Sequence, residues 1–559
     1  MIRTASKDSL IKLLLSIDGK SYQKYKELSS SYELDDVTLY IDKIQNEAAS
    51  SSFMRLRTSL KKAGFPADTY DTKIKGTALR DLIARRFWES CRMYAKGNSD
   101  GNTGGMISIP RPGQEIMERS CVVLSETFIE VRFKASLPSA GRNAAGRSAA
   151  KMLTEDLAEI ARSSLFYASY KSSKLYGHIN TAVTANNIRS SLRERGLAAF
   201  IADGSTLPRR DDGLAPMNDA VPFRSPDTLL TSFPASDGGT VKGMGIPEGL
   251  TAVIGATGHG KTTLIEAIAS GVYDHIPGDG RELVITADDA VVITRDVGRP
   301  VGNVDVSMFI CDAGRNVRSL SADHADDALS SAASAAEMME IGSRLLIMDD
   351  MSVSHGLLYS DERICGLIPA GDETMIPISE TMRDPNFEGM SAIVACRHGD
   401  LTDNADTVII MSKHAVADAI RSFVIVNVDF PHPGGMPADR IPMARNMNVS
   451  KGKKEVSAAA LSASKAEIGE TVIRIPYPVK DVGEMSSIAD AILDAKEIMD
   501  GTATLKEVAE HLESIYRERI RSADENMGPD RAAFRRYDLA AVINRHPDIV
   551  FGQRSPPNR

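Results

Sequence analysis

The residues best suited to chemistry in this chain form a glycine-rich loop at residues 255–262. The loop reads Gly-Ala-Thr-Gly-His-Gly-Lys-Thr and fits GxxxxGK[ST] at every fixed position. It follows the apolar run Leu250–Ile254 and precedes the helix-forming stretch 264–270, which is the context that this motif requires. Glycines let consecutive backbone N–H groups turn toward phosphate oxygens, and a helix N-terminus adds partial positive charge. The motif therefore predicts a binding site for ATP and Mg²⁺.

The polar residues of this loop have separate expected roles. The Lys261 ammonium should reach the β- and γ-phosphates, and the Thr262 hydroxyl is placed to bind Mg²⁺. Thr263 can donate a hydrogen bond to an α-phosphate from the next helical position. The residues expected to contact the nucleotide are Gly255, Ala256, Thr257, Gly258, His259, Gly260, Lys261, Thr262 and Thr263.

Magnesium also needs a carboxylate near Thr262, supplied from another strand of a parallel sheet. The apolar run Leu345–Met348 ends at Asp349 and Asp350. We expect Asp349 to bind the metal and Asp350 to act as the catalytic residue that orients the attacking water. Glu is the usual residue at the second position, so Asp350 is one methylene short. The alternative for both carboxylates is that they cap a turn at the strand end.

A histidine follows the next apolar strand. The run Ala392–Cys396 ends at Arg397 and His398, and a further apolar run, Thr407–Met411, comes close behind it. We expect His398 to be a second catalytic residue, which senses the γ-phosphate through a hydrogen bond. The evenly weighted alternative is a solvent-exposed histidine in a loop.

Length and composition indicate several ordinary packed domains. Of the 559 residues, 42% are hydrophobic and 25% are charged, which predicts two to four globular domains. No run of 18 apolar residues occurs, so no membrane-spanning helix is expected. The five scattered cysteines have neither the spacing of a zinc site nor the even number of a disulfide framework. No targeting peptide is visible at the start.

Composition shifts divide the chain into three parts. Residues 1–165 mix helical and strand patterns and predict a basic α+β domain. Residues 166–455 alternate apolar strands with helices, which predicts an α/β core. Residues 456–559 are expected to be a linker and a small helical domain, because 432–470 are rich in Pro, Gly, Lys, Ala and Ser with little periodicity. The core strands are expected at Leu250–Ile254, Leu283–Ile285, Leu345–Met348, Ala392–Cys396, Thr407–Met411 and Phe423–Val428.

Further motifs, long enough to be specific, extend over nearly the whole chain. They are Ile17–Tyr22, Arg111–Glu115, Leu137-Pro138 with Gly141-Arg142 and Gly146-Arg147, Ala220–Pro226, Tyr273–Glu282 and Arg536–Ala541. These segments resemble the family of predicted ABC-class ATPases, which is distinct from the transporter ATPases. The resemblance implies an α/β fold with an ABC-ATPase-like P-loop core, an N-terminal α+β domain and a small C-terminal helical domain.

The characterised branch of that family, to which this chain is similar, is a mitochondrial RNA-binding accessory of kinetoplastid RNA editing. The resemblance therefore implies a homodimer that binds RNA. The basic surfaces of such a dimer would face each other with little base readout, which predicts little sequence selectivity. The resemblance also implies association with a protein complex of RNA processing and location in the mitochondrial matrix. No membrane partner is expected, because nothing in the sequence spans or obviously docks on a membrane.

One departure from the family pattern lies at residues 321–328. ABC proteins generally present a Ser-Gly-Ser type signature there, at a helix N-terminus, whereas this chain reads Ser-Ala-Asp-His-Ala-Asp-Asp-Ala. Asp326 and Asp327 suit a helix cap, but they would repel a phosphate from a partner subunit. We therefore expect ATP binding to be intact and hydrolysis to be weak.

A second departure concerns the glutamine that usually reaches the metal. No Gln lies between Lys261 and Asp349. The residues that could substitute for it are Asn303, Asp305 and Ser307.

The N-terminal region carries an excess of positive charge. Residues 51–160 hold 18 Lys and Arg against 12 Asp and Glu, on a chain whose net charge is -9. A groove for nucleic acid and a merely solvated surface both fit this excess. The expected RNA-binding residues are Arg55, Arg57, Lys61, Lys62, Arg85, Arg86, Arg92, Arg142 and Arg147.

One expected helix, Ala78–Tyr94, combines arginines with the single tryptophan of the chain, Trp88. Arginines beside an indole offer phosphate contacts together with a stacking surface for bases. The alternative is that Trp88 belongs to the core and that Asp81 and Glu89 pair with the arginines of the helix.

Three functions fit these patterns. The leading hypothesis is an ATP-dependent RNA-binding homodimer with slow hydrolysis. An active ATPase that remodels nucleic acid or protein is disfavoured by the altered signature. A small-molecule P-loop kinase would need a lid with arginines, for which the candidates are Arg281, Arg295 and Arg299.

Overall fold

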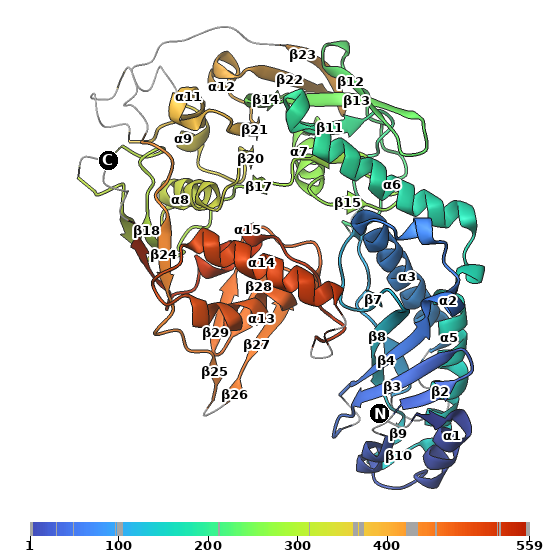
Figure 1. Ribbon diagram of the computed structural model, residues 1–559. Coiled ribbons are helices and arrows are strands. Elements are labelled where there is room, and N and C mark those ends of the chain that lie inside the picture. The colour runs from blue at the N-terminus through green and yellow to red at the C-terminus, as the bar shows by residue number, and fades with distance from the viewer. Residues whose placement is uncertain are drawn as a thin grey trace. The chain divides into compact units, whose positions relative to one another are not determined.

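The computed structural model describes residues 4–28, 31–47, 50–95, 97, 104–210, 213–311, 314–360, 367, 374–420, 434–452, 455–522, 524 and 527–554. Contacts divide the chain into two compact units (Figure 1). The first comprises Met1–Ala182 with Ile515–Ala533, and the second comprises Val183–Ser514 with Phe534–Arg559. The first unit therefore includes a segment that sequence analysis assigned to a separate C-terminal domain.

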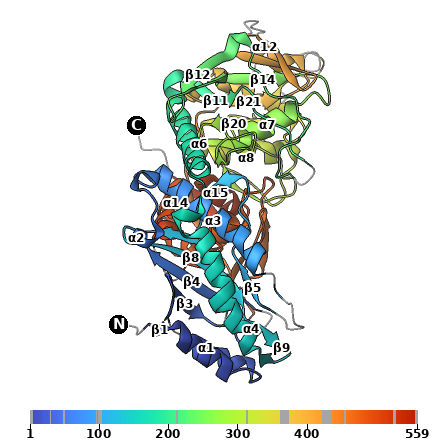
Figure 2. The same ribbon diagram turned by 90° about the vertical axis from the view of Figure 1, so that its right-hand side faces the viewer.

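A seven-stranded sheet forms the centre of the first unit. Its order is β1-β2-β3-β4-β8-β5, with β7 also paired to β8, and Figure 2 shows β3, β4 and β8 side by side. The antiparallel register of β4 and β8 sets Arg55 opposite Arg132 and Arg57 opposite Glu130. The strands are β1 (Ala5–Ser6), β2 (Ser31–Leu34), β3 (Val37–Lys43), β4 (Ser52–Ser59), β5 (Met106–Ser108), β7 (Val122–Leu124) and β8 (Phe128–Ser136).

The period of two along a strand separates charge from the apolar core in this sheet. The charged side chains of β4 and β8 share one face, while residues such as Leu56 and Val131 point to the other face and are buried. Helix α3 contacts the apolar side, where the rings of Phe87 and Phe133 lie 5.8 Å apart. The helices of this unit are α1 (Lys7–Ser16), α2 (Leu60–Ala63), α3 (Lys73–Tyr94), α4 (Gly146–Lys151) and α5 (Leu157–Ser164).

The second unit contains a six-stranded sheet of order β17-β20-β21-β14-β22-β23. Its strands are parallel from β17 to β22, and β23 is antiparallel. Parallel strands buried on both faces are continuous apolar runs, which is why the sequence predicts them well. The strands are β14 (Leu250–Ile254), β17 (Ala290–Val292), β20 (Leu345–Asp349), β21 (Ser391–Ala395), β22 (Thr407–Ser412) and β23 (Ala415–Ile420).

A four-stranded antiparallel sheet, β12-β13-β11-β16, accompanies it. Its strands are β11 (Leu197–Ala202), β12 (Leu230–Pro234), β13 (Thr240–Pro247) and β16 (Val284–Thr286). The strand predicted at Leu283–Ile285 is therefore present, but it belongs to this sheet and not to the parallel one. A short apolar run looks the same in both kinds of sheet. The strand predicted at Phe423–Val428 lies outside the described residues.

Helix α7 (Lys261–Ser270) joins the two sheets through one apolar core. Leu264 and Ile268 are fully buried, together with Val253 of the parallel sheet and Ile201 of the antiparallel one. The other long helices near these sheets are α6 (Ser172–Ser191) and α8 (Asp327–Glu340). The helix that begins at the glycine-rich loop therefore packs against both the parallel and the antiparallel sheet.

Residues 432–470, interpreted from their low periodicity as a linker, contain strands where the structure describes them. β24 (Arg440–Met443) pairs with β30 (Val550–Gln553), which is distant in sequence. β27 (Ala458–Ser462), β28 (Lys465–Ile468) and β29 (Thr471–Arg474) form an antiparallel sheet in which Ile468 is fully buried. Short Ala/Ser-rich strands carry little apolar signal of their own and depend on the elements against which they pack.

The periodicity at residues 488–499 and 505–515 predicts two C-terminal helices, and both are present as α13 (Val482–Ile498) and α14 (Leu505–Arg521). A third helix, α15 (Arg536–Ile543), was not predicted. The spacing of Thr504 and Glu507 predicts a capping box, and it is present. The Glu507 amide lies 3.2 Å from the Thr504 hydroxyl, and the Thr504 amide lies 2.8 Å from the Glu507 carboxylate.

Candidate functional site

The glycine-rich loop adopts a conformation that only glycine tolerates at its key positions. Gly258 and Gly260 have φ values of 77° and 96°, in the left-handed region. Gly255 has a φ of 149°, and a Cβ there would lie 2.4 Å from the Met411 carbonyl oxygen on β22. The loop is therefore shaped both by its own backbone and by the neighbouring strand.

Lys261 lies within the curve of this loop. Its ammonium donates to the carbonyl oxygens of Gly255 at 2.7 Å and Ala256 at 3.1 Å, and the residue is 8% exposed. A desolvated cation beside backbone N–H groups at a helix N-terminus suits a polyphosphate. The position agrees with the role expected for Lys261.

Thr262 and Asp349 are brought together across the parallel sheet. The Thr262 hydroxyl donates to the Asp349 carboxylate at 2.8 Å, although the two residues lie 87 positions apart in sequence. Strand β20 carries Asp349 to the carboxyl edge of the sheet, where β14 ends in the loop. A hydroxyl and a carboxylate at this distance are two oxygen ligands that Mg²⁺ accepts. The site therefore fits a magnesium nucleotide.

Asp350 is 7% exposed and is joined to a residue with no assigned role in the sequence analysis, Arg397. The Arg397 guanidinium lies 3.4 Å from the Asp350 carboxylate and donates to the Thr257 hydroxyl of the loop at 3.1 Å. Its side chain is 47% exposed. Arg397 thus connects the catalytic candidate with the phosphate loop. The sequence feature that could have indicated Arg397 is its position directly after a core strand.

His398 lies in the same region and stacks on an aromatic side chain. Its ring is 4.0 Å from the Tyr359 ring at an interplanar angle of 23°, and 6.2 Å from the His355 ring. His398 itself is exposed, at the N-terminal cap of α12 (Gly399–Asn404). The stack orients the imidazole, and it depends on residues that no motif indicated.

A basic turn also lies beside the loop. Lys413 and His414 connect β22 to β23 with φ values of 51° and 65°, which are unfavourable for residues with a Cβ. The Lys413 amide lies 3.4 Å from the His259 imidazole nitrogen. Such strain is often kept where side chains serve a site. Neither residue was singled out from the sequence.

The altered signature forms a helix cap, as expected. The Asp326 carboxylate accepts a hydrogen bond from the Leu329 amide at 2.8 Å, at the N-terminus of α8. Asp327 lies 3.3 Å from the Arg295 guanidinium. One first-turn N–H group, that of Leu329, is thus already bonded to a carboxylate.

The three substitutes considered for the missing glutamine are engaged elsewhere. The Asn303 amide donates to the Phe551 carbonyl at 3.1 Å, and the Ser307 hydroxyl donates to Asp305 at 2.7 Å. Within the described ranges, none of the three bonds to residues 255–262.

The arginines considered for a kinase lid are largely internal. Arg281 is 4% exposed and donates to the Leu207 carbonyl, and burial lowers its pKa to about 10. Arg299 is 5% exposed and makes a bidentate pair with Glu337 at 3.0 and 2.9 Å. Buried arginines cannot close over a substrate, so Arg281 and Arg299 are excluded as lid residues of a kinase.

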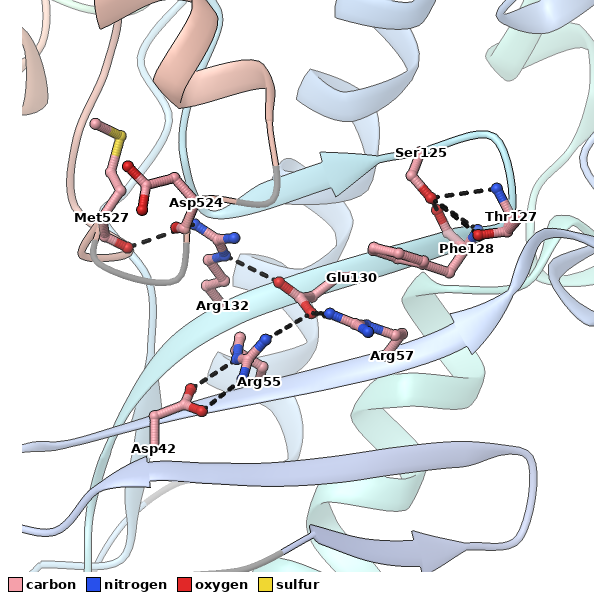
Figure 3. Close-up of polar contacts among 10 residues, drawn as sticks. All are labelled: Asp42, Arg55, Arg57, Ser125, Thr127, Phe128, Glu130, Arg132, Asp524 and Met527. Atoms are coloured by element: carbon pink, nitrogen blue, oxygen red, sulfur yellow. Dashed lines mark hydrogen bonds and ion pairs between the residues drawn. The ribbon is translucent and has the colours of Figure 1, made fainter. Parts of the chain in front are cut away.

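Part of the predicted RNA-binding set faces inward. Arg55 is 8% exposed and donates to Asp42 and Glu130, and Arg57 also donates to Glu130 (Figure 3). These two arginines are therefore not open surface contacts. They were counted as surface charge because charge alone does not reveal a buried partner.

Arg85 has the partner that the alternative hypothesis named. It lies 2.6 Å from Asp81, which is buried. Burial by itself would raise the pKa of Asp81, but Arg85 and His178 hold it well below its usual value. Arg86 pairs with Glu89 at 3.4 Å, again as the alternative proposed.

The other members of the RNA-binding set are exposed: Lys61, Lys62, Arg92, Arg142 and Arg147. Arg92 lies 5.0 Å from the Trp88 ring, and Arg111 lies 5.5 Å from it. Trp88 is half-buried, so part of the indole remains at the surface with two guanidinium groups near it.

Comparisons with known proteins identify the two main parts of the chain. Residues 7–168 match the N-terminal domain of ATPases of the ABC class, and residues 171–433 match the P-loop domain of the ABC ATPase family. The uncharacterized protein MJ1628 of Methanocaldococcus jannaschii is 41% identical over 108 residues. That match covers 18% of this chain and 24% of the relative, so the chain spans about a quarter of the relative's length.

Solved structures of ABC proteins are similar at low identity. A bacterial Atm1-family ABC exporter with ATP bound has 10% identity and a TM-score of 0.24, with 50% of each chain covered. MJ1267, an ATP-binding cassette of an ABC transporter, has 12% identity and a TM-score of 0.19, with 32% of this chain and 83% of the other covered. No helix in the described part of this chain is long and apolar enough to cross a membrane.

The two domain matches cover most of the sequence, and they identify the nucleotide-binding fold as that of an ABC-class P-loop ATPase.

Proposed function

We propose that this protein binds ATP with Mg²⁺ at residues 255–262 and hydrolyses it slowly. The observation that carries the proposal is the hydrogen bond of 2.8 Å between Thr262 and Asp349, beside the enclosed ammonium of Lys261. A phosphate loop, a hydroxyl and a strand-end carboxylate at this spacing are the parts that a magnesium nucleotide needs.

The residues of the site divide the work of hydrolysis. Lys261 would hold the β- and γ-phosphates, and Thr262 and Asp349 would hold Mg²⁺, which would supply positive charge to the phosphoryl group. Asp350 accepts a hydrogen bond from the attacking water and orients it. Arg397, between Asp350 and the loop, can turn its exposed guanidinium toward the γ-phosphate.

Slow hydrolysis follows from three features of the same site. Asp350 has a shorter reach than Glu, and its carboxylate is engaged by Arg397. The usual glutamine is missing, and its considered substitutes are bonded elsewhere. The carboxylates at Asp326 and Asp327 repel a phosphate from a second subunit. We therefore expect ATP binding to matter more for the function of this protein than ATP hydrolysis.

We propose further that the protein acts as a homodimer that binds RNA with little sequence selectivity, as part of a complex that processes RNA. The support is the resemblance to the family, together with exposed cations in the N-terminal unit and an indole with two arginines near its ring. The same resemblance suggests the mitochondrial matrix as the location.

The experiment combines calorimetry, turnover and light scattering on the purified protein. ATP with Mg²⁺ should bind, and turnover should stay low with and without RNA. Absence of ATP binding would overturn the nucleotide proposal, and rapid RNA-stimulated turnover would favour the remodelling ATPase. A monomer under all nucleotide conditions would contradict the dimer.

RNA binding is tested separately by anisotropy at several salt concentrations. Affinity should fall linearly in the logarithm of salt concentration, with a slope near 0.7 per phosphate neutralised. Arg142→Glu with Arg147→Glu should reduce affinity and slope while leaving ATP binding intact. Salt-independent binding, or no binding, would move the protein out of the nucleic-acid class.

A further inference from the structure

The turn between β22 and β23 has a backbone conformation that its two residues disfavour. Ser412 pairs with Ala415, so Lys413 and His414 alone form the turn. Their φ values are 51° and 65°, both in the left-handed region. A two-residue hairpin turn with positive φ at both positions is usually Asn-Gly or Gly-Gly, because glycine adopts this conformation without a steric cost. The chain therefore keeps two large side chains where glycine would be less strained.

This turn lies against the phosphate loop. The Lys413 amide donates to His259 Nδ1 at 3.4 Å. A Cβ placed on Gly260 would lie 3.8 Å from Nδ1 of the His414 imidazole, which puts that ring beside the N-terminus of α7. Both side chains of the turn are exposed, and among the described residues neither has a hydrogen-bond or salt-bridge partner. They are therefore available to a ligand held by the loop.

The order of the strands indicates which part of a nucleotide would reach the turn. In the sheet β17-β20-β21-β14-β22-β23, the phosphate loop follows β14 (Figure 1). Asp349 and Arg397, assigned above to Mg²⁺ and the γ-phosphate, lie at or just after the ends of β20 and β21, on one side of β14. The turn follows β22, on the other side. A nucleotide whose γ-phosphate lies toward β20 and β21 therefore directs its nucleoside toward the turn.

The imidazole of His414 suits the base of such a nucleotide. A planar aromatic ring can stack on the face of any base. The tight turn limits where this ring can lie, so less conformational entropy is lost when a ligand binds. Glycine at the same position would relieve the backbone but would offer no ring. Strained residues persist mainly at sites that use them.

We propose that His414 contacts the base of the bound nucleotide, and that this contact is the reason why the chain keeps a strained turn. The hydrogen bond from the Lys413 amide to His259 holds the turn against the phosphate loop. The inference rests on the proposed binding of ATP at residues 255–262, and it adds the nucleoside side of that site.

Calorimetry on the full chain compares ATP with inorganic tripolyphosphate, which has the three phosphates but no nucleoside, both with Mg²⁺. His414→Ala should weaken ATP binding about tenfold, because a stacking contact is lost, and should leave tripolyphosphate binding unchanged. Lys261→Ala should weaken the binding of both ligands. His511→Ala removes an exposed histidine of the same unit and should change neither affinity.

The two ligands distinguish the possible failures. If His414→Ala binds ATP as tightly as the unaltered protein does, the inference is wrong and the proposed function stands. An equal loss for ATP and tripolyphosphate would place His414 on the phosphates and would also overturn the contact with the base. Absence of ATP binding by the unaltered protein would overturn the proposed function, and the inference with it.

His414→Gly separates the contribution of the side chain from that of the backbone. Both His414 variants lack the ring, so they should lose the same ATP affinity. Only the glycine variant relieves the positive φ, so its midpoint of denaturant unfolding should be higher than that of the alanine variant. Equal midpoints would refute the strain in the turn, and undiminished ATP affinity in the glycine variant would refute the contact with the base.

Discussion

Charged side chains are arranged in opposite ways in the two units. In the second unit, Lys261 bonds to carbonyl oxygens of the phosphate loop, Arg397 links that loop to Asp350, and the Arg397 side chain is half exposed. In the first unit, Arg55 and Arg132 surround the buried carboxylate of Glu130. The first arrangement is open to a ligand. The second is closed on itself, apart from Arg132 Nη2, which has no hydrogen-bond partner among the described residues. Burial of the partner carboxylate, more than the number of cations, decides whether a cluster can bind anions.

The largest effect is expected from removing the carboxylate of Glu130, at the centre of the closed cluster in the first unit. Glu130→Gln should destabilise the protein by about 3–5 kcal/mol, because three guanidinium groups, those of the buried Arg55 and Arg132 and of the partly exposed Arg57, lose their common partner. Denaturant unfolding measures the change. Glu126→Gln, on an exposed residue two strand positions before β8, serves as the control and should stay within about 0.5 kcal/mol. Similar stability of both variants would mean that the cluster is not closed.

The corresponding change at the open site should affect binding and spare stability. Lys261→Ala should weaken ATP binding about a hundredfold, or about 2.7 kcal/mol, because the ammonium is the only positively charged side chain of the loop. Calorimetry measures this. Lys465→Ala, on an exposed lysine of the same unit, should leave the affinity unchanged. Unaltered affinity in Lys261→Ala would refute the assignment of the loop.

Arg397 differs from the arginines of the first unit because it is paired with Asp350 and yet its side chain is half exposed. Arg397→Ala should lower ATP turnover about tenfold, with little change in ATP affinity, since its effect is expected in the transition state. Arg397→Lys, which keeps the charge but not the planar fork, should recover only part of the rate. A loss of affinity equal to the loss of turnover would indicate a role in binding alone.

The two carboxylates at the end of β20 should separate in the same assays. Asp349→Asn should weaken the magnesium dependence of ATP binding, because it removes a charged metal ligand. Asp350→Asn should leave binding nearly intact and lower hydrolysis. Identical behaviour of the two variants would contradict the assigned roles.

The smallest expected effect is at the altered signature. Asp326→Ser with Asp327→Gly should raise turnover about two- to fivefold, since it removes roughly 0.3–1 kcal/mol of repulsion at a helix N-terminus. The gain should require the dimer and vanish on dilution to monomer. No gain in a dimer established by light scattering would indicate that Asp350 or the missing glutamine limits the rate.

Local patterns in the sequence were sufficient for much of the second unit. The run Leu250–Ile254 is β14 as predicted, and the loop after it has the glycine conformations that the motif implies. The run Leu345–Met348 became β20, which carries Asp349 to Thr262. These predictions succeeded because residues adjacent in sequence determine a buried parallel strand and the turn that follows it.

Pairings between distant residues could not be predicted in this way. The stack of His398 on Tyr359 and the bridge from Arg397 to Thr257 each join segments that are far apart in sequence. The pairing of β24 with β30 is of the same kind. A single sequence does not indicate which two distant segments will lie against each other.

The sequence by itself determined the phosphate loop, the strands that present it and the acidic strand end, because each depends on spacing over a few residues. Only the tertiary structure decided which cations are available to a ligand. Arg55 and Arg92 look alike in the sequence, but one is buried on Glu130 and the other lies exposed over Trp88. The physical reason is that a charge is neutralised or presented by its partner and its solvation, and both are set by chain segments remote from it.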